Sequence, residues 1–243
     1  MDLDIQDPQC QNTASFPGSG ELGAKALDKG ATMPHSPHTA PMPAILLLGP
    51  TGSGKTPLGE RLEQGGLGNT PCVHFDFGAQ LRAAVARGES HPCLSPSELD
   101  FLRTVLETGA LLEDEHFPIA LRILQSFRID RCTDPTTLVV LNGLPRHLGQ
   151  ARVLEGMVEV RAVVELQCSA ETVWQRLHQN TGGDRTGRDD DHPEAVGAKL
   201  AIFQQRTAPL VEYYAAQGVR RLMIQVAPEM VAEQMVDHLR QRI

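Results

Sequence analysis

Residues 49–56 read GPTGSGKT and form the clearest chemical signature in the chain. Their spacing is that of the Walker A loop, in which glycines allow backbone N–H groups to close around phosphate oxygens while a lysine neutralises the outer phosphates. The residues expected to hold these phosphates are Gly49, Gly52, Ser53, Gly54, Lys55 and Thr56. The hydroxyl of Thr56 is also the expected Mg²⁺ ligand. The motif therefore predicts a phosphate site and leaves open what receives the phosphate.

Two arginines follow glycines in segments that leave apolar runs of the chain. Arg82 follows Gly78, and Arg146 follows Gly143. Ligands of open α/β sheets bind at the carboxyl ends of strands, so either guanidinium group can grip an acceptor phosphate with two hydrogen bonds. The alternative for Arg82 is a solvent-facing side chain on a helix.

Three more arginines, Arg176, Arg185 and Arg188, bracket the short glycine-rich segment NTGGDRTGR. Such a segment can fold over phosphates and exclude water, so these arginines are candidates for contact with a transferring phosphoryl group. The segment contains no cysteine, which excludes a zinc-bearing lid.

The elements that must position these residues are short apolar runs alternating with longer helical stretches. Strands are expected at 44–48, 72–75, 137–141, 162–167 and 221–226. Helices are expected at 55–64, 78–87, 95–108, 113–129, 147–157, 170–180, 192–217 and 228–241. Runs that are apolar almost throughout are typical of parallel strands covered on both faces. The pattern predicts an α/β P-loop fold of three layers, with a five-stranded parallel sheet between helices.

Length and composition limit the possible partners. A chain of 243 residues fits one domain of about 200 residues with an extension. The net charge of −8 and the 4% of aromatic residues disfavour a nucleic-acid binder. No apolar run reaches the roughly 18 residues that span a membrane. The five cysteines form no CxxC pair, so we expect no zinc site, no disulfide framework and a cytoplasmic location.

The chain divides into two parts by composition. Residues 1–43 are rich in Pro, Gly, Ser, Thr and His and have almost no apolar periodicity, which predicts a disordered N-terminal extension. Residues 44–243 are expected to form the globular domain.

Five blocks of this domain follow one another in a familiar order. They are the P-loop, HFDFGAQLR (74–82), ETGALLEDE (107–115), NGLPRHLGQA (142–151) and GRDDDHPEAVGAKLAIFQQRTAPLVEYY (187–214). Together they resemble the short-lid members of the adenylate kinase family of nucleoside monophosphate kinases. The resemblance implies a helical monophosphate-binding part at about 76–108 and a short lid at about 177–191.

The same resemblance implies a reaction and a role for each candidate residue. The reaction is reversible transfer of the γ-phosphoryl group of ATP, with Mg²⁺, to AMP or a related monophosphate, by a monomer acting on small nucleotides. Lys55 would hold the donor phosphates, and Gln150 would read the acceptor base. The catalytic residues would be Lys55, Arg82, Arg146, Arg176, Arg185 and Arg188. The acceptor would be bound by Phe77, Gly78, Arg82, Gly143, Arg146, Gln150, Arg188 and Lys199.

Several positions depart from the family pattern. Asn142 stands where the family's DGFPR block supplies an aspartate near Mg²⁺, so metal affinity is expected to fall. Phe77 replaces a threonine beside the acceptor, Asn180 stands where a second lid arginine is expected, and Lys199 replaces an arginine. These departures leave two alternatives: a nucleotide-binding module without efficient transfer, and a P-loop kinase with a non-nucleotide acceptor.

Overall fold

The structure is a computed structural model that describes residues 40–88, 91–132, 134–184 and 193–242. Its five strands are β1 (Met42–Leu48), β2 (Cys72–Asp76), β3 (Leu138–Asn142), β4 (Val158–Gln167) and β5 (Arg220–Gln225). They form one sheet in the order β2-β3-β1-β4-β5, and every neighbouring pair is parallel. The predicted five-stranded parallel sheet is therefore confirmed.

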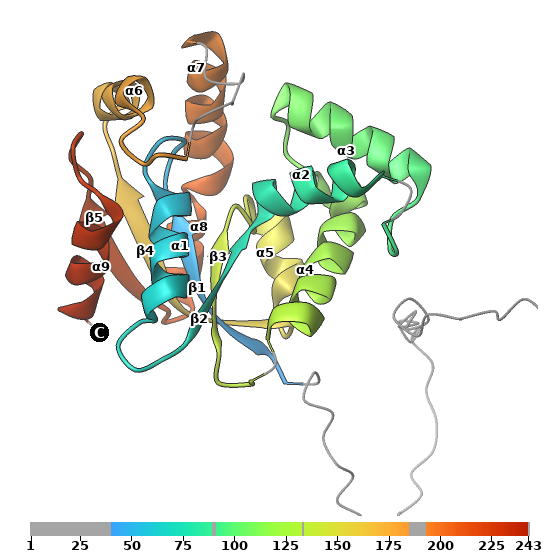
Figure 1. The fold of residues 1–243 in the computed structure, drawn as a ribbon, viewed down its shortest axis with the longest axis horizontal. Helices are drawn as coiled ribbons and strands as arrows, with labels where there is room; N and C mark the ends of the chain where they lie inside the picture. The colour runs from blue at the N-terminus through green and yellow to red at the C-terminus, as the bar shows by residue number, and fades with distance from the viewer. Residues whose placement is uncertain (1–39, 89–90, 133, 185–192, 243) are drawn as a thin grey trace, which may run out of the picture.

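Helices cover both faces of this sheet (Figure 1). One face packs against α1 (Lys55–Gly65) and α9 (Ala232–Arg240), with Leu58, Leu62 and Met235 in the apolar contact. The other packs against α4 (Phe117–Arg131), α5 (Leu148–Leu154) and α8 (Leu210–Ala216). The remaining helices are α2 (Phe77–Arg87), α3 (Pro96–Thr108), α6 (Ala170–Gln179) and α7 (Pro193–Ile202), with the short segments η3 (Asp114–His116) and η4 (Phe203–Thr207). Three layers result, as the apolar strands predict.

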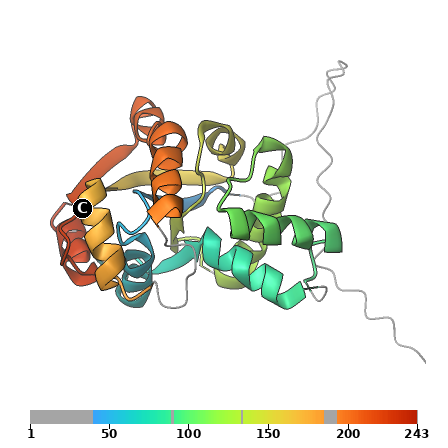
Figure 2. The same ribbon diagram turned by 90° about the horizontal axis from the view of Figure 1, so that it is seen from above.

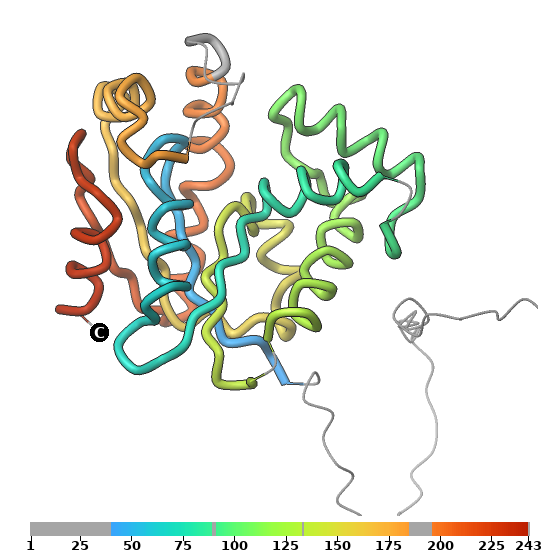
Figure 3. The backbone as a smooth tube through the Cα atoms, in the orientation of Figure 1, coloured from blue at the N-terminus to red at the C-terminus, as the bar shows by residue number. Residues whose placement is uncertain are grey.

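The α2–α3 pair projects from the sheet on the side away from α9. Figure 2 shows this from above, and Figure 3 shows it in the backbone tube. Both helices begin at a capping side chain: Asp76 accepts a hydrogen bond from the N–H of Ala79, and Ser95 forms a capping box with Glu98. Gly109 ends α3 in the left-handed conformation at φ 67°. The pair spans most of 76–108, whose role as the monophosphate-binding part stays a prediction.

The helices expected at 113–129 and 228–241 begin four residues later, at Phe117 and Ala232, and two strands begin earlier than expected. Strand β4 begins at Val158, four residues before the apolar run at 162, and β1 begins at Met42. Both early starts have one cause, because Met42 pairs with Val158 in the sheet and is only 3% exposed. Pairing between the two strands thus extends both of them beyond the continuous apolar runs from which the strands were predicted; in β4 the added residues, VEVR, alternate between apolar and polar.

The helix expected at 192–217 is interrupted. It consists of α7, the π-helical segment η4 and α8, and the N–H of Ala208 donates to the carbonyl oxygen of Phe203, five residues earlier. Pro209 lies at the start of α8, where its missing N–H removes a helical hydrogen bond. The wider turn brings Thr207 to the carbonyl oxygen of Arg146, to which its hydroxyl donates at 2.7 Å.

Candidate functional site

The P-loop joins the end of β1 to the start of α1, at the carboxyl edge of the sheet. Gly52 and Gly54 have positive φ angles, 73° and 95°, which favour glycine. A Cβ at Gly49 would lie 2.8 Å from the carbonyl oxygen of Leu166 on β4, so the close approach of these strands requires glycine there. The loop is therefore shaped by backbone geometry that the GPTGSGKT sequence supplies.

Lys55 lies across this loop. Its Nζ donates to the carbonyl oxygens of Gly49 at 2.8 Å and Pro50 at 2.7 Å, and it approaches Ser53 Oγ at 3.5 Å. These contacts hold the ammonium group over the loop that the sequence predicts to wrap phosphates. That this amine binds the outer phosphates stays a prediction.

A polar cluster lies next to the loop at the ends of β2 and β3. Thr56 Oγ1 donates to Asp76 Oδ2 at 2.6 Å, and Asn142 Nδ2 donates both to that oxygen at 2.8 Å and to Thr56 Oγ1 at 3.1 Å. Asp76 and Asn142 are register partners in the sheet. A hydroxyl and a carboxylate are the hard oxygen ligands that Mg²⁺ prefers, so the cluster fits this ion.

Asp76 is a site residue that the sequence analysis missed. Asn142 does remove a carboxylate from β3, as expected, but Asp76 brings one to the same place from β2. The signal was available: an acidic residue directly follows the apolar run 72–75, at the edge where parallel strands end.

One cavity of about 740 Å³ joins the P-loop to the walls made by α2, α3, α5 and α7. The expected site residues that line it are Gly49, Gly52, Gly54, Lys55, Thr56, Phe77, Gly78, Arg82, Gly143, Arg146, Gln150 and Lys199. Ser53 is fully buried beneath the loop. Arg185 and Arg188 lie outside the described residues. Donor and acceptor candidates thus share one cavity.

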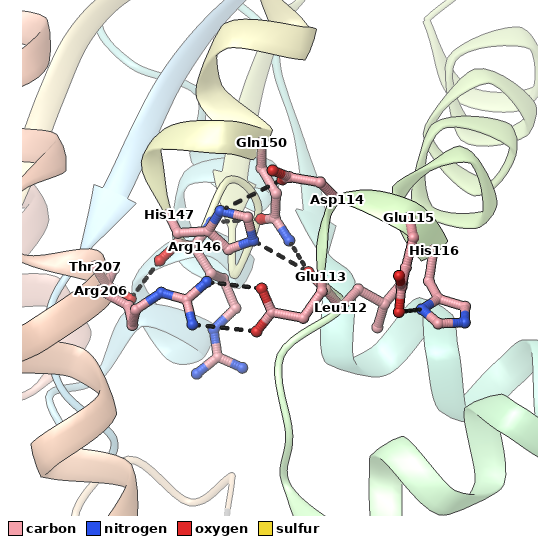
Figure 4. A network of polar contacts seen from close by, with 10 residues as sticks. All are labelled: Leu112, Glu113, Asp114, Glu115, His116, Arg146, His147, Gln150, Arg206 and Thr207. Carbon is pink, nitrogen blue, oxygen red and sulfur yellow. Dashed lines mark hydrogen bonds and ion pairs between the residues drawn. The ribbon is translucent and has the colours of Figure 1, made fainter.

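Arg146 follows β3 and its side chain is half-buried at the cavity wall. In the described part of the chain its guanidinium makes no hydrogen bond or ion pair, and Figure 4 shows it pointing away from the polar network around it. Burial lowers the pKa of this guanidinium, which still leaves it charged at neutral pH. A desolvated cation without a protein anion is suited to a phosphate group.

Gln150 is 1% exposed, and both ends of its amide have backbone partners (Figure 4). Nε2 donates to the carbonyl oxygen of Leu112 at 2.8 Å, and Oε1 accepts from the N–H of Arg146 at 2.7 Å. One amide hydrogen and one lone pair remain on this side chain. That it reads the acceptor base stays a prediction.

Phe77 and Arg82 lie on α2. Phe77 is 5% exposed and stacks on Phe75 with ring centroids 6.2 Å apart, so it belongs to the core as well as to the cavity wall. Arg82 is exposed, and a Cβ at Gly78 would lie 3.4 Å from its Nη1. Gly78 therefore leaves room for the guanidinium to lie along its own helix beside the cavity.

Arg176 on α6 is buried among backbone carbonyl groups, unlike Arg82 and Arg146, which line the cavity. It is 3% exposed, does not line the cavity, and donates to the carbonyl oxygen of Gly52 at 3.0 Å. Its Nη1 donates to the carbonyl oxygens of Ala227, Pro228 and Met230 at 2.7–3.2 Å. In this arrangement Arg176 braces the P-loop, and its expected contact with the transferring group stays a prediction.

An ion pair that the sequence did not reveal connects two walls of the cavity. Arg206 of η4 donates to both carboxylate oxygens of Glu113 at 3.1 and 2.8 Å (Figure 4). This hydrogen bonding lowers the pKa of Glu113 and raises that of Arg206. The two residues are far apart in the chain, so only the fold brings them together.

Comparison with known proteins identifies the family. The family model described as "Adenylate kinase" matches residues 47–219. The adenylate kinase of Stenotrophomonas maltophilia strain K279a is 33% identical over 182 residues, covering 72% of this chain and 86% of that protein. That of Parvibaculum lavamentivorans strain DS-1 is 31% identical over 186 residues, covering 73% and 82%.

Within the residues that the structure describes, no helix combines the length and apolar character needed to cross a membrane. The P-loop, the parallel sheet and these matches agree with one another. The chain belongs to the adenylate kinase family and is an ATP-dependent nucleoside monophosphate kinase, a phosphotransferase.

Proposed function

We propose that the preferred acceptor is AMP and that the reaction is reversible transfer of the γ-phosphoryl group of ATP, with Mg²⁺, to form two molecules of ADP. One observation carries the transfer between two phosphate sites, and the choice of AMP is supported by the name adenylate kinase of the relatives. The half-buried guanidinium of Arg146, which has no protein partner within the described ranges, lies in the same cavity as the P-loop. The cavity thus offers one cationic site for donor phosphates and a second for an acceptor phosphate.

Each residue has a defined task in this scheme. Lys55 and the loop N–H groups bind the donor phosphates, and Arg146 with Arg82 orients the acceptor phosphate. Bound Mg²⁺ would neutralise charge on the donor phosphates, with Thr56 among its ligands. Catalysis then consists of positioning and charge stabilisation, because phosphoryl transfer between nucleotides needs no covalent intermediate.

The remaining roles follow the same division between donor and acceptor. Gln150 and Phe77 select the base, Gly78 and Gly143 leave room for the acceptor, and Lys199 assists its phosphate. Arg176, Arg185 and Arg188 contact the transferring group when the segment at about 177–191 covers the cavity and excludes water. The tasks of Gln150, Phe77, Gly78, Gly143 and Lys199 are supported by their place in the lining of the cavity.

The enzyme is also proposed to act as a cytoplasmic monomer with small nucleotides as its only substrates. Residues 1–39 of the expected N-terminal extension lie outside the described residues, and Met42 and Pro43 belong to β1. Gel filtration with light scattering measures the mass in solution, and a dimer would contradict the monomer.

The direct test is to mix the purified protein with ATP, Mg²⁺ and one of AMP, GMP, CMP, UMP or dTMP, and to follow diphosphate formation by chromatography. We expect ADP with AMP and far less diphosphate with the others. Lys55→Met is the negative control: it should abolish turnover and keep the circular dichroism spectrum. Equal turnover with another monophosphate would contradict the choice of AMP, and an active Lys55→Met would contradict the donor site.

A further inference from the structure

The carboxylate of Asp76 has two oxygens with separate partners. Oδ1 accepts from the N–H of Ala79 at 2.9 Å and caps α2, while Oδ2 accepts from Thr56 and Asn142 at 2.6 and 2.8 Å. Helix capping uses a single oxygen and explains only the first contact. The second oxygen lies against the hydroxyl of the P-loop residue whose type and position are those of a Mg²⁺ ligand.

Asn142 completes the geometry. It is 4% exposed, and its Nδ2 donates to both Asp76 Oδ2 and Thr56 Oγ1. A carboxylate at position 142 would place two negative charges side by side at the ends of β2 and β3, which is unfavourable without a cation. The amide instead holds the hydroxyl and the one carboxylate in place.

We propose that Asp76, from β2, supplies the carboxylate of the Mg²⁺ site, and that Asn142 is a positioning residue for it. This inference rests on the proposed function, because it concerns the metal that accompanies ATP. A single carboxylate with a hydroxyl and water is a usual arrangement for Mg²⁺ at nucleotide phosphates. Relative to the family pattern described above, the negative charge has moved from one strand to its neighbour.

The position of Asp76 also connects the metal to the acceptor side. The same side chain caps α2, and α2 carries Phe77 and Arg82 at the cavity. Mg²⁺ would therefore bind Oδ2 of the same carboxylate whose Oδ1 caps the start of α2. A variant that keeps the cap and removes the charge separates these two functions.

The experiment measures ATP binding by calorimetry, with Mg²⁺ and with EDTA, and compares the gain in affinity that Mg²⁺ provides. Asp76→Asn keeps a good helix cap but removes the charge. In this variant we expect the ratio of ATP affinity with Mg²⁺ to ATP affinity in EDTA to fall by about tenfold or more. Its affinity for metal-free ATP should be unchanged or higher. A full gain in this variant would overturn the inference.

The charge swap Asp76→Asn/Asn142→Asp is the decisive second variant. It returns one carboxylate to the cluster from β3, and we expect it to recover most of the Mg²⁺-dependent gain. Failure of a folded swap protein to recover any gain would overturn the inference. Glu60→Gln is the matched control, since it removes a nearby carboxylate that is exposed on α1. The pKa of Glu60 is raised first by partial burial, then by the charge of Asp184 and then by that of Asp76, so the two carboxylates are close.

The two proposals fail in different ways. If the unmodified protein binds no ATP in either buffer, the proposed function fails and the inference fails with it. If it binds ATP and turns over AMP while Asp76→Asn keeps the full Mg²⁺ gain, only the inference fails.

Discussion

The backbone N–H of Arg146 donates a hydrogen bond of 2.7 Å to Oε1 of Gln150. The residue proposed to hold the acceptor phosphate and the residue proposed to read the acceptor base are therefore fixed to each other. A change in Gln150 must disturb both the base and the phosphate ends of the acceptor site.

Gln150→Leu tests this connection. It leaves the N–H of Arg146 without its partner in a buried site, which costs about 1–3 kcal/mol of folding stability, while the carbonyl oxygen of Leu112 keeps its contact with Nε2 of His147 at 3.1 Å. We expect KM for AMP to rise by about tenfold, because both ends of the acceptor lose their positioning. Steady-state kinetics and urea unfolding measure the two effects. Gln179→Leu, at an exposed position on α6, is the control, and an unchanged KM in Gln150→Leu would contradict the role.

Substitutions at Arg146 should separate charge from shape. Arg146→Lys keeps the positive charge but loses the two-pronged geometry, and Arg146→Met loses both. We expect kcat/KM for AMP to fall by about 10² in the methionine variant and by less in the lysine variant. Coupled ADP assays at varied AMP concentration measure both.

Arg146→Met should not lower the melting temperature, because it removes a desolvated cation that has no protein partner among the described residues. Arg152→Met, at an exposed position on α5, the helix that follows Arg146, should change neither kinetics nor melting. Wild-type kcat/KM in Arg146→Met would remove Arg146 from the acceptor site.

Arg176→Met should mainly lower the stability of the fold, whereas Arg146→Met should mainly lower kcat/KM. The guanidinium of Arg176 is buried, and removing it takes a hydrogen-bond donor from the carbonyl oxygens of Gly52, Pro228 and Met230 and one of the two donors from that of Ala227. We expect a loss of about 1.5–3 kcal/mol in the free energy of unfolding, together with weaker ATP binding as the loop loses its brace. Denaturant unfolding and calorimetry test this. Arg161→Met removes an exposed ion pair as the comparison, and equal stability of the two variants would contradict the bracing role.

Glu98 gives a pH-dependent prediction. Burial raises its pKa, but hydrogen bonds from Ser95 and Arg122 outweigh that effect, so the pKa lies below the ordinary value of 4.5. A carboxyl group with a lowered folded-state pKa stabilises the fold above its unfolded pKa, and this stabilisation disappears as pH falls through the folded value. Glu98→Gln keeps the capping box but loses the charge.

We therefore expect Glu98→Gln to be about 0.5 kcal/mol less stable than the unmodified protein at pH 7, a small figure because its partner Arg122 is partly exposed. The difference should vanish well below pH 4.5. Urea unfolding across this range measures it, with Glu107→Gln, exposed on the same helix, as the control. A difference that stays constant with pH would show that charge is not its cause.

The sequence was sufficient to locate the five strands and the P-loop between β1 and α1. Apolar runs mark buried parallel strands, and glycine spacing marks a loop whose geometry is local, so both can be interpreted without the fold. The helix starts at Ser95 and Ser169 were predictable for the same reason, since a cap involves residues three apart.

Contacts between distant segments could not be predicted in this way. Asp76 and Asn142 meet only because β2 and β3 pair in one particular register, and Arg206 meets Glu113 only because η4 packs beside the 107–115 segment. The early start of β4 has the same origin, since it depends on pairing with Met42. The burial of Arg176 was missed because a lid arginine and a bracing arginine have the same sequence appearance.

The brace formed by Arg176 has a consequence for the order in which the enzyme is made. The P-loop leaves the ribosome early, but three of the carbonyl groups that fix Arg176 against it belong to residues 227–230, near the end of the chain. A nascent or truncated chain that stops after the family match at residue 219 would contain every residue of the Walker motif and lack the support beneath it. Nucleotide binding should therefore begin only once the chain has been synthesised past residue 230.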